Sequence, residues 1–170
     1  MNKAIRLVAA GALLAAGLPL TAIAQTITIN ASVASQCNIG NATVNLGPLN
    51  LAVQTNNIGT NVVLTCNRGA TVAVALNNGA NPSGTQKRLN LGTDFINYNI
   101  TVPTISGTTT SCPALPGTEW NGTNTLAASS MFSASGGPRN LALCVSVPAG
   151  QFDVGVGAYA DTVTATLTVS

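Results

Sequence analysis

Four cysteines are the residues best suited to chemistry in this chain, namely Cys37, Cys66, Cys112 and Cys144. None belongs to a Cys-x-x-Cys pair and the sequence holds no histidine, so the spacing argues against a structural zinc site. An even number of cysteines in an exported chain favours disulfides, and sequence allows three pairings. We favour Cys37 with Cys66 and Cys112 with Cys144, because each pair closes a local loop of about thirty residues. A disulfide that closes such a loop stabilises the folded chain by roughly 3.5 kcal/mol.

Other groups that could catalyse a reaction are scarce. Without histidine, a Ser-His-Asp or Cys-His arrangement is excluded. A Ser-Lys pair would have to use Lys87, which lies in a polar stretch typical of a solvated loop, and a paired-carboxylate glycosidase would have to draw on four scattered acids. The glycines fall at turns and form no phosphate-binding loop. We therefore expect no catalytic residue, no cofactor and no metal, in a protein that is not an enzyme.

The first 24 residues have the pattern of a secretory signal peptide. A short basic region with Lys3 and Arg6 precedes an apolar run over residues 7–18, and Ala22-Ile23-Ala24 is a small-x-small cleavage site. Glycine and proline interrupt the apolar run, which is shorter than the ~20 residues that a membrane span needs. We predict that residues 1–24 are removed on export and that the chain meets the membrane only through them.

The remainder of the chain is almost without charge. Lys3 and Arg6 account for two of the six basic residues, so the four that remain balance the four acidic residues. Such a surface has no electrostatic footprint for nucleic acid or for an anionic membrane, and we expect neither as a partner. The roughly 146 residues left suit one domain with a sizeable core.

Short β-strands dominate these residues. The clearest closes the chain, where Val163, Ala165, Leu167 and Val169 alternate with threonines in the period of a half-buried strand. Its backbone needs a partner on each side and no later residues supply one, so we expect an edge strand or pairing with something else. Further apolar clusters, separated by polar turns, lie at 27–33, 44–46, 62–64, 72–76, 96–100 and 141–145. This order predicts an all-β sandwich.

Two longer stretches, 79–93 and 103–128, have no strand pattern. The second holds Trp120, the single tryptophan, beside Asn121. Trp120 either stacks on a sugar or covers the open end of the sandwich. We favour the second, because large aromatic side chains are mostly buried and no second ring forms a platform.

The order of these segments resembles the spore coat protein U domain family across the whole mature chain. The features that carry the resemblance are an alternating segment ending at Cys37, Val62-Val63-Leu64-Thr65-Cys66, Arg88-Leu89 before Ile96-Asn97-Tyr98-Asn99, and the closing Gly157-Ala158-Tyr159-Ala160-Asp161-Thr162-Val163. The closing segment is the most specific of them. The chain differs from the usual pattern in its second cysteine pair, its long 103–128 stretch and its Val169-Ser170 ending.

That family includes subunits of archaic chaperone-usher pili. The resemblance implies an incomplete immunoglobulin-like β-sandwich over residues 37–170 that lacks its last strand. A periplasmic chaperone would lend a strand beside the terminal strand, where Val163, Ala165, Leu167 and Val169 would receive it. An outer-membrane usher would then pass the subunit to the cell surface, and the N-terminal segment of a neighbouring subunit would replace the chaperone by donor-strand exchange.

Residues 25–36 would be this donor segment. Ile27, Ile29, Ala31 and Val33 lie on one face, and seven residues extend to roughly 24 Å, which is about one sheet edge. The same alternation also fits the first strand of the domain itself, so the sequence leaves both assignments open.

We therefore predict a structural subunit of a pilus that serves surface attachment or biofilm formation. A coat protein of a spore or cell surface would share the fold and the export without strand exchange. A secreted carbohydrate-binding module would need a sugar platform around Trp120. A single domain argues against a two-domain tip adhesin, and an open groove predicts that the mature chain polymerises or aggregates without a chaperone.

Overall fold

The computed structural model describes residues 25–170, and the predicted signal peptide at 1–24 lies outside them. The chain divides into two units, Met1–Ser32 and Val33–Ser170. In the first unit, residues 25–32 form no helix or strand, and Ile27 and Ile29 are exposed. Among residues 25–170, no helix has the length and apolar character that crossing a membrane requires.

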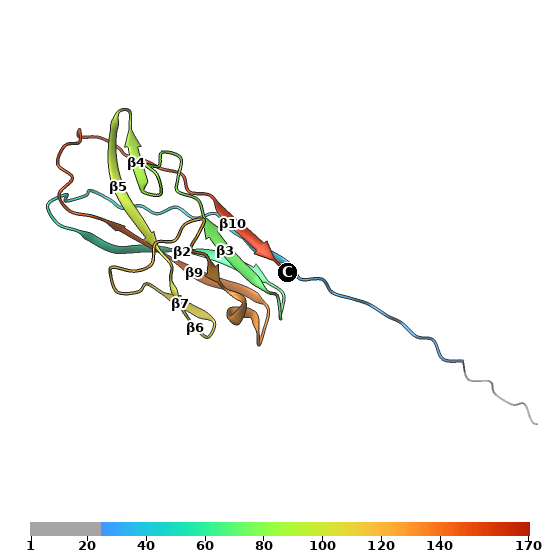
Figure 1. Ribbon diagram of the computed structural model, residues 1–170. Helices are drawn as coiled ribbons and strands as arrows, with labels where there is room; N and C mark the ends of the chain where they lie inside the picture. Colours follow the sequence, from blue (N-terminus) through green and yellow to red (C-terminus); the bar gives the residue numbers. More distant parts are fainter. Residues whose placement is uncertain (1–24) are drawn as a thin grey trace, which may run out of the picture. The chain divides into compact units, whose positions relative to one another are not determined.

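The second unit, Val33–Ser170, is built from two antiparallel sheets and a hairpin (Figure 1). The strands of the larger sheet are, in spatial order, β1 (Cys37–Ile39), β2 (Thr55–Cys66), β9 (Gly137–Val147), β5 (Asp94–Thr101) and β4 (Lys87–Leu91). Those of the smaller sheet are β10 (Ala165–Val169), β3 (Val72–Leu76) and β8 (Leu126–Ala127). The hairpin consists of β6 (Thr104–Ser106) and β7 (Thr109–Ser111), and η1 (Ser129–Phe132) is a short 3-10 helix.

The core lies between the two sheets and follows the period of two along each strand. In β3, Val72, Val74 and Leu76 are buried while the residues between them are partly exposed. In β2, Val62 and Leu64 are buried while Val63 is exposed. Alternate side chains of a strand point to opposite faces of its sheet, so each strand presents one apolar face to the other layer.

Most of the predicted strands are confirmed. The clusters at 62–64, 72–76, 96–100 and 141–145 lie within β2, β3, β5 and β9, and the terminal alternation forms β10. The cluster at 44–46 forms no strand, although its Val44 and Leu46 are half-buried against the core. The strand predicted as one option at 27–33 is also absent, and β1 is the first strand.

The two stretches without a strand pattern nevertheless contain strands. The stretch 79–93 holds β4, which begins with Lys87, a lysine that is fully buried. Because lysine is almost never fully buried unless it is paired, its presence hid the inward face of this strand. The stretch 103–128 holds β6, β7 and β8, which are two or three residues long and carry too few side chains for an alternation to be recognised.

The structure contains both disulfides that the spacing favoured. Cys37 and Cys66 stand opposite each other in the β1–β2 ladder and are bonded, with a sequence separation of 29. Cys112 follows β7 and is bonded to Cys144 in β9, with a separation of 32. No cysteine of the described chain is free.

The β6–β7 hairpin covers part of the edge of β9. Strand β5 pairs with β9 only from Cys144 to Ser146, so the preceding residues of β9 lack that neighbour. There the Thr110 hydroxyl accepts a hydrogen bond from the Ala142 N–H at 2.7 Å and donates one to the Asn140 carbonyl at 3.1 Å. The Thr110 side chain thus supplies hydrogen bonds to the part of the β9 edge that does not pair with β5.

Candidate functional site

The terminal strand has one partner and one open side. Strand β10 pairs with β3 in register from Ala165 opposite Leu76 to Val169 opposite Val72, and no other described strand pairs with β10. Strand β1, at the edge of the other sheet, pairs only with β2 among the described strands. Each sheet therefore ends, at this side of the sandwich, on a strand that has a neighbour on one edge only.

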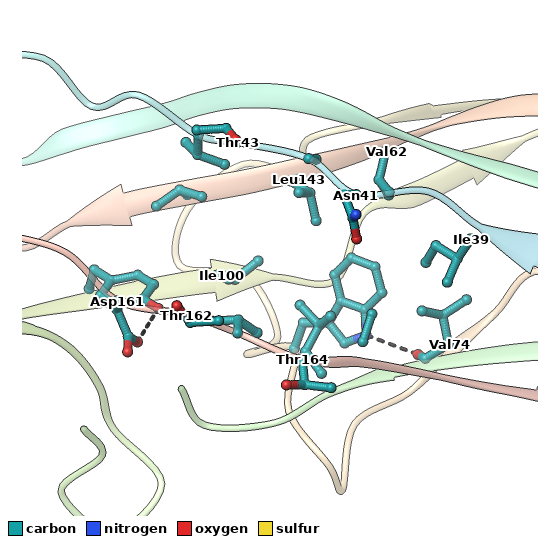
Figure 2. Close-up of a pocket in the computed structure, with 18 of the residues that line it drawn as sticks. Ile39, Asn41, Thr43, Val62, Val74, Ile100, Leu143, Asp161, Thr162 and Thr164 are labelled. Atoms are coloured by element: carbon teal, nitrogen blue, oxygen red, sulfur yellow. Dashed lines mark hydrogen bonds between the residues drawn. The ribbon is translucent and has the colours of Figure 1, made fainter. Parts of the chain in front are cut away.

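A groove of about 650 Å³ lies between residues 39–46 and 161–165, and we call it the open groove. Its floor is apolar and includes Val62, Val74, Ile100, Trp120, Leu143 and Val145. Figure 2 shows Ile100 and Leu143 between the segment that carries Asn41 and Thr43 and the segment that carries Asp161 and Thr164. An extended apolar trough between two backbone segments fits a β-strand better than a compact ligand.

The four residues predicted to receive a strand occupy two kinds of position. Val163 and Ala165 line the open groove, whereas Leu167 and Val169 do not line it but pack half-buried against the core. None of the four is fully buried, although the residues of β3 that face inward beside them are. The inner face of the terminal strand is therefore only partly covered by this chain.

Asp161 fixes one end of the open groove. Its carboxylate accepts hydrogen bonds from the Ala80 N–H at 2.8 Å and from the Tyr98 hydroxyl at 2.7 Å. Burial, and then the hydrogen bond to Asp161, raises the pKa of Tyr98 well above its ordinary value of 10.0. The phenol therefore stays protonated and serves as a hydrogen-bond donor from the β5 strand.

Backbone pairing continues along the groove ahead of β10. Thr164 donates its N–H to the Asn77 side chain at 2.9 Å, and its carbonyl accepts the Asn77 N–H at 3.0 Å. Asn90 and Ala160 exchange backbone hydrogen bonds at 2.9 and 3.2 Å, which ties this segment to β4. Residues 160–164 are thus hydrogen-bonded on the edge that faces Asn77 and β4, while their opposite edge faces the open groove.

Trp120 lies beneath the open groove and is fully buried. Its indole N–H donates to the Val74 carbonyl at 3.0 Å, a bond drawn in Figure 2. The buried Lys87 ammonium donates to the Trp120 carbonyl and to the Glu119 carboxylate, each at 2.8 Å. A buried indole cannot stack on a sugar, so the hypothesis that Trp120 forms a carbohydrate-binding platform is wrong.

The predicted donor residues Ile27, Ile29, Ala31 and Val33 are exposed, and their role stays a prediction. Within residues 25–170, no cluster of His, Cys, Asp or Glu is arranged to hold a metal. The sequence missed the pairing of Tyr98 with Asp161. Both residues stand in segments that carried the family resemblance, and this was the only signal that could have pointed to them.

We compared the chain with known proteins to identify its fold and its family. A comparison with curated proteins finds no match. Among solved structures, the chain is similar to a chain in the crystal structure of the CsuC–CsuE chaperone–tip adhesion subunit pre-assembly complex from the archaic chaperone-usher Csu pili of Acinetobacter baumannii. The identity is 20%, the TM-score is 0.51, and the match covers 79% of this chain but only 40% of the other.

The fold is thus an immunoglobulin-like β-sandwich, with the space between its edge strands β1 and β10 left open. Residues 23–166 match the sequence family described as Spore Coat Protein U domain. That match spans nearly all of the sandwich, from before β1 into β10. The chain belongs to the spore coat protein U domain family.

Proposed function

We propose that this protein is a structural subunit of an archaic chaperone-usher pilus. Its open groove receives a strand from a periplasmic chaperone and, in the fibre, the N-terminal segment of a neighbouring subunit. The observation that carries the proposal is the half-covered inner face of β10 beside a groove of about 650 Å³. Contiguous apolar surface along an unpaired strand edge is a binding site for an extended strand.

The composition of the groove favours an apolar strand as its occupant. Among the charged side chains of residues 25–170 only Asp161 lines it, and that carboxylate already accepts hydrogen bonds from Ala80 and Tyr98. A strand with Ile27, Ile29, Ala31 and Val33 on one face would place those side chains on the floor and its polar residues toward solvent. The assignment of residues 25–36 as donor segment rests on this match of chemistry and length.

The rest of the proposal concerns the route and the purpose. The N-terminal 24 residues would direct export to the periplasm, where oxidation forms both disulfides. A chaperone would hold the subunit until an outer-membrane usher adds it to a fibre on the cell surface. We propose that the fibre serves attachment or biofilm formation. The chain spans two fifths of the Csu complex chain that it matches, so it would supply one domain of such an assembly.

Charge substitutions on the two strands test the proposal. Ile29→Asp should leave folding and chaperone binding intact and prevent insertion into a neighbour, because an unpaired buried carboxylate is strongly penalised. Leu167→Asp, on the inner face of β10, should damage folding and chaperone capture. Co-purification with the chaperone and recovery in fibres separate the two stages: Ile29→Asp is expected with chaperone but absent from fibres, and Leu167→Asp is expected in neither.

The sequence offers a matched control for each variant. Asn30→Asp adds the same charge next to Ile29 on the alternate face, and Thr166→Asp does so next to Leu167 at an exposed position. Both controls should assemble normally. If Ile29→Asp abolishes chaperone-bound subunit as thoroughly as Leu167→Asp, residues 27–33 belong to the domain's own core. A wild-type subunit that stays a stable monomer without chaperone would favour the coat-protein alternative.

A further inference from the structure

The residues just ahead of β1 are fastened to Asn67. The Gln36 N–H donates to the Asn67 side-chain oxygen at 2.9 Å, and the Asn67 side-chain NH₂ donates to the Ala34 carbonyl at 2.9 Å. The Asn67 backbone N–H also donates to the Gln36 carbonyl, at 3.1 Å. We call this set of three bonds the Asn67 clamp. It lies next to the Cys37–Cys66 disulfide, which fixes the adjacent pair of the ladder.

The Asn67 clamp holds residues 34–36 as an extension of β1. In an extended backbone, polar groups two residues apart point to the same side. The Ala34 carbonyl and both polar backbone groups of Gln36 face Asn67, as this period requires. The Asn67 side chain is at the surface and is not part of the core. Its hydrogen bonds therefore fix the direction of the backbone at residues 34–36 and contribute little to core packing.

Strand directions show what filling its own groove would demand of this chain. The antiparallel pairs β1–β2, β2–β9, β9–β5 and β5–β4, followed by the antiparallel bridge of Asn90 with Ala160, make the β10 segment run opposite to β1. To enter the groove beside residues 39–46, residues 27–33 would have to reverse direction within 34–36. They would then run parallel to β10, the less stable of the two pairings.

We propose that Asn67 is a positioning residue that denies the open groove to the subunit's own N-terminal segment and so reserves it for a strand of another chain. This inference rests on the proposed function, because it concerns the same groove and the same segment. A tight turn needs the backbone of residues 34–36, and the Asn67 clamp holds that backbone straight. Strand exchange between subunits then has no competing reaction within one subunit.

Isotope-coded photo-cross-linking tests the inference on the refolded full-length mature subunit. A photoactivatable residue replaces Thr166, which is exposed on β10. It can react with side chains on the same face of any strand that pairs with β10. Equal amounts of ¹⁴N- and ¹⁵N-labelled subunit are mixed before refolding, and cross-links from β10 to residues 25–36 are read by mass spectrometry. Pairs with mixed labels come from two chains, whereas an excess of uniform labels reports insertion within one chain.

The wild-type protein should give the random share of mixed pairs, as insertion between chains requires. Asn67→Ala should raise the ratio of within-chain to between-chain links by about tenfold, the shift expected from losing two hydrogen bonds of ordinary net strength. Asn67→Asp keeps the acceptor for Gln36 and loses the donor for Ala34, so it should fall between them and serves if the alanine variant does not fold. Asn50→Ala, which removes another exposed asparagine cap, is the control and should match the wild type.

The possible failures are distinct. A label ratio that is the same in Asn67→Ala, Asn67→Asp and wild type overturns the role of Asn67 and leaves the proposed function standing. A wild type that already links mainly within one chain overturns the role of Asn67 and also the assignment of residues 25–36 as a donor for a neighbour. A wild type without any link between β10 and residues 25–36 overturns the donor-strand function, and this inference with it.

Discussion

At the scale of single residues, the open groove depends on Asp161 and the groups around it. The Asp161 carboxylate joins three segments, because it accepts from Ala80 after β3, from Tyr98 in β5, and itself precedes β10. Gly79 makes this approach feasible, since its φ of +84° suits glycine and a Cβ there would collide with the carboxylate. The groove is therefore shaped by polar contacts at its end as well as by its apolar floor.

Tyr98→Phe should change how stability depends on pH. Because the folded-state pKa of Tyr98 is raised above its ordinary value of 10.0, the folded chain holds the phenol proton more tightly than the unfolded chain does. This contribution is complete below about pH 10 and is lost as pH rises further. Urea unfolding of dilute refolded subunit at pH 8 and pH 10.5 should show a smaller loss in the phenylalanine variant, which should also be about 1–3 kcal/mol less stable at pH 8. An identical loss in both proteins would contradict the assignment.

Gly79→Ala should destabilise the subunit more than a glycine substitution that affects only the backbone. Gly69 has a similar φ of +79° but no atom within 4 Å of an added Cβ, so Gly69→Ala reports the backbone cost, about 1–2 kcal/mol. Gly79→Ala should cost at least about 1 kcal/mol more, because it also displaces Asp161. Thermal unfolding of the two variants side by side measures the difference, and equal losses would show that Asp161 moves freely.

At the scale of elements, the hairpin β6–β7 is a separate two-stranded sheet that is fastened to strand β9 of the larger sheet. It is fixed by the Thr110 bonds to β9 and by the Cys112–Cys144 disulfide. The following residues return to the core, where Val102 and Thr118 share a backbone bond of 2.8 Å and Trp120 is buried. The long 103–128 stretch is thus anchored at both ends.

Replacing both Cys112 and Cys144 by alanine should loosen this stretch selectively. Loss of the cross-link should cost roughly 3–4 kcal/mol of stability, if the constraint on the unfolded chain dominates. Hydrogen exchange should accelerate in β6, β7 and the residues after them and stay slow in β1 and β2, which keep their own disulfide. Uniform acceleration across the sandwich would indicate that the hairpin is part of its cooperative core.

The elements also show how far sequence could lead. Strands with a full alternation, such as β3 and β10, were recognisable, because one face meets the core and the other meets water. Strand β4 was not, since Lys87 occupies an inward position and its burial depends on bonds to Glu119 and to the Trp120 carbonyl, which lie 32 and 33 residues further along the chain. The end of the open groove was equally hidden, because the Tyr98–Asp161 bond spans 63 residues. Local patterns cannot report such distant partners.

At the scale of the whole molecule, a separate donor strand should complete the fold. A synthetic peptide of residues 25–36 added to dilute subunit should raise the unfolding temperature, with a gain near 2.7 kcal/mol at a hundred times its dissociation constant. The same peptide with Ile29→Asp should have little effect, and the peptide with Asn30→Asp should act as the unchanged one does. Equal stabilisation by all three peptides would contradict an apolar register in the groove.

The other edges of the two sheets differ from this one. At its other end, the smaller sheet stops at β8, which is only two residues long. The larger sheet stops at β4, which carries Arg88 beside the buried Lys87 and is already bridged to the Ala160 backbone. Short or charged edges resist further pairing. If residues 25–36 are the single donor and the open groove the single acceptor, each subunit can link to two neighbours and no more. Polymers of bifunctional units are linear, so this protein would yield unbranched threads and no network, whatever its concentration.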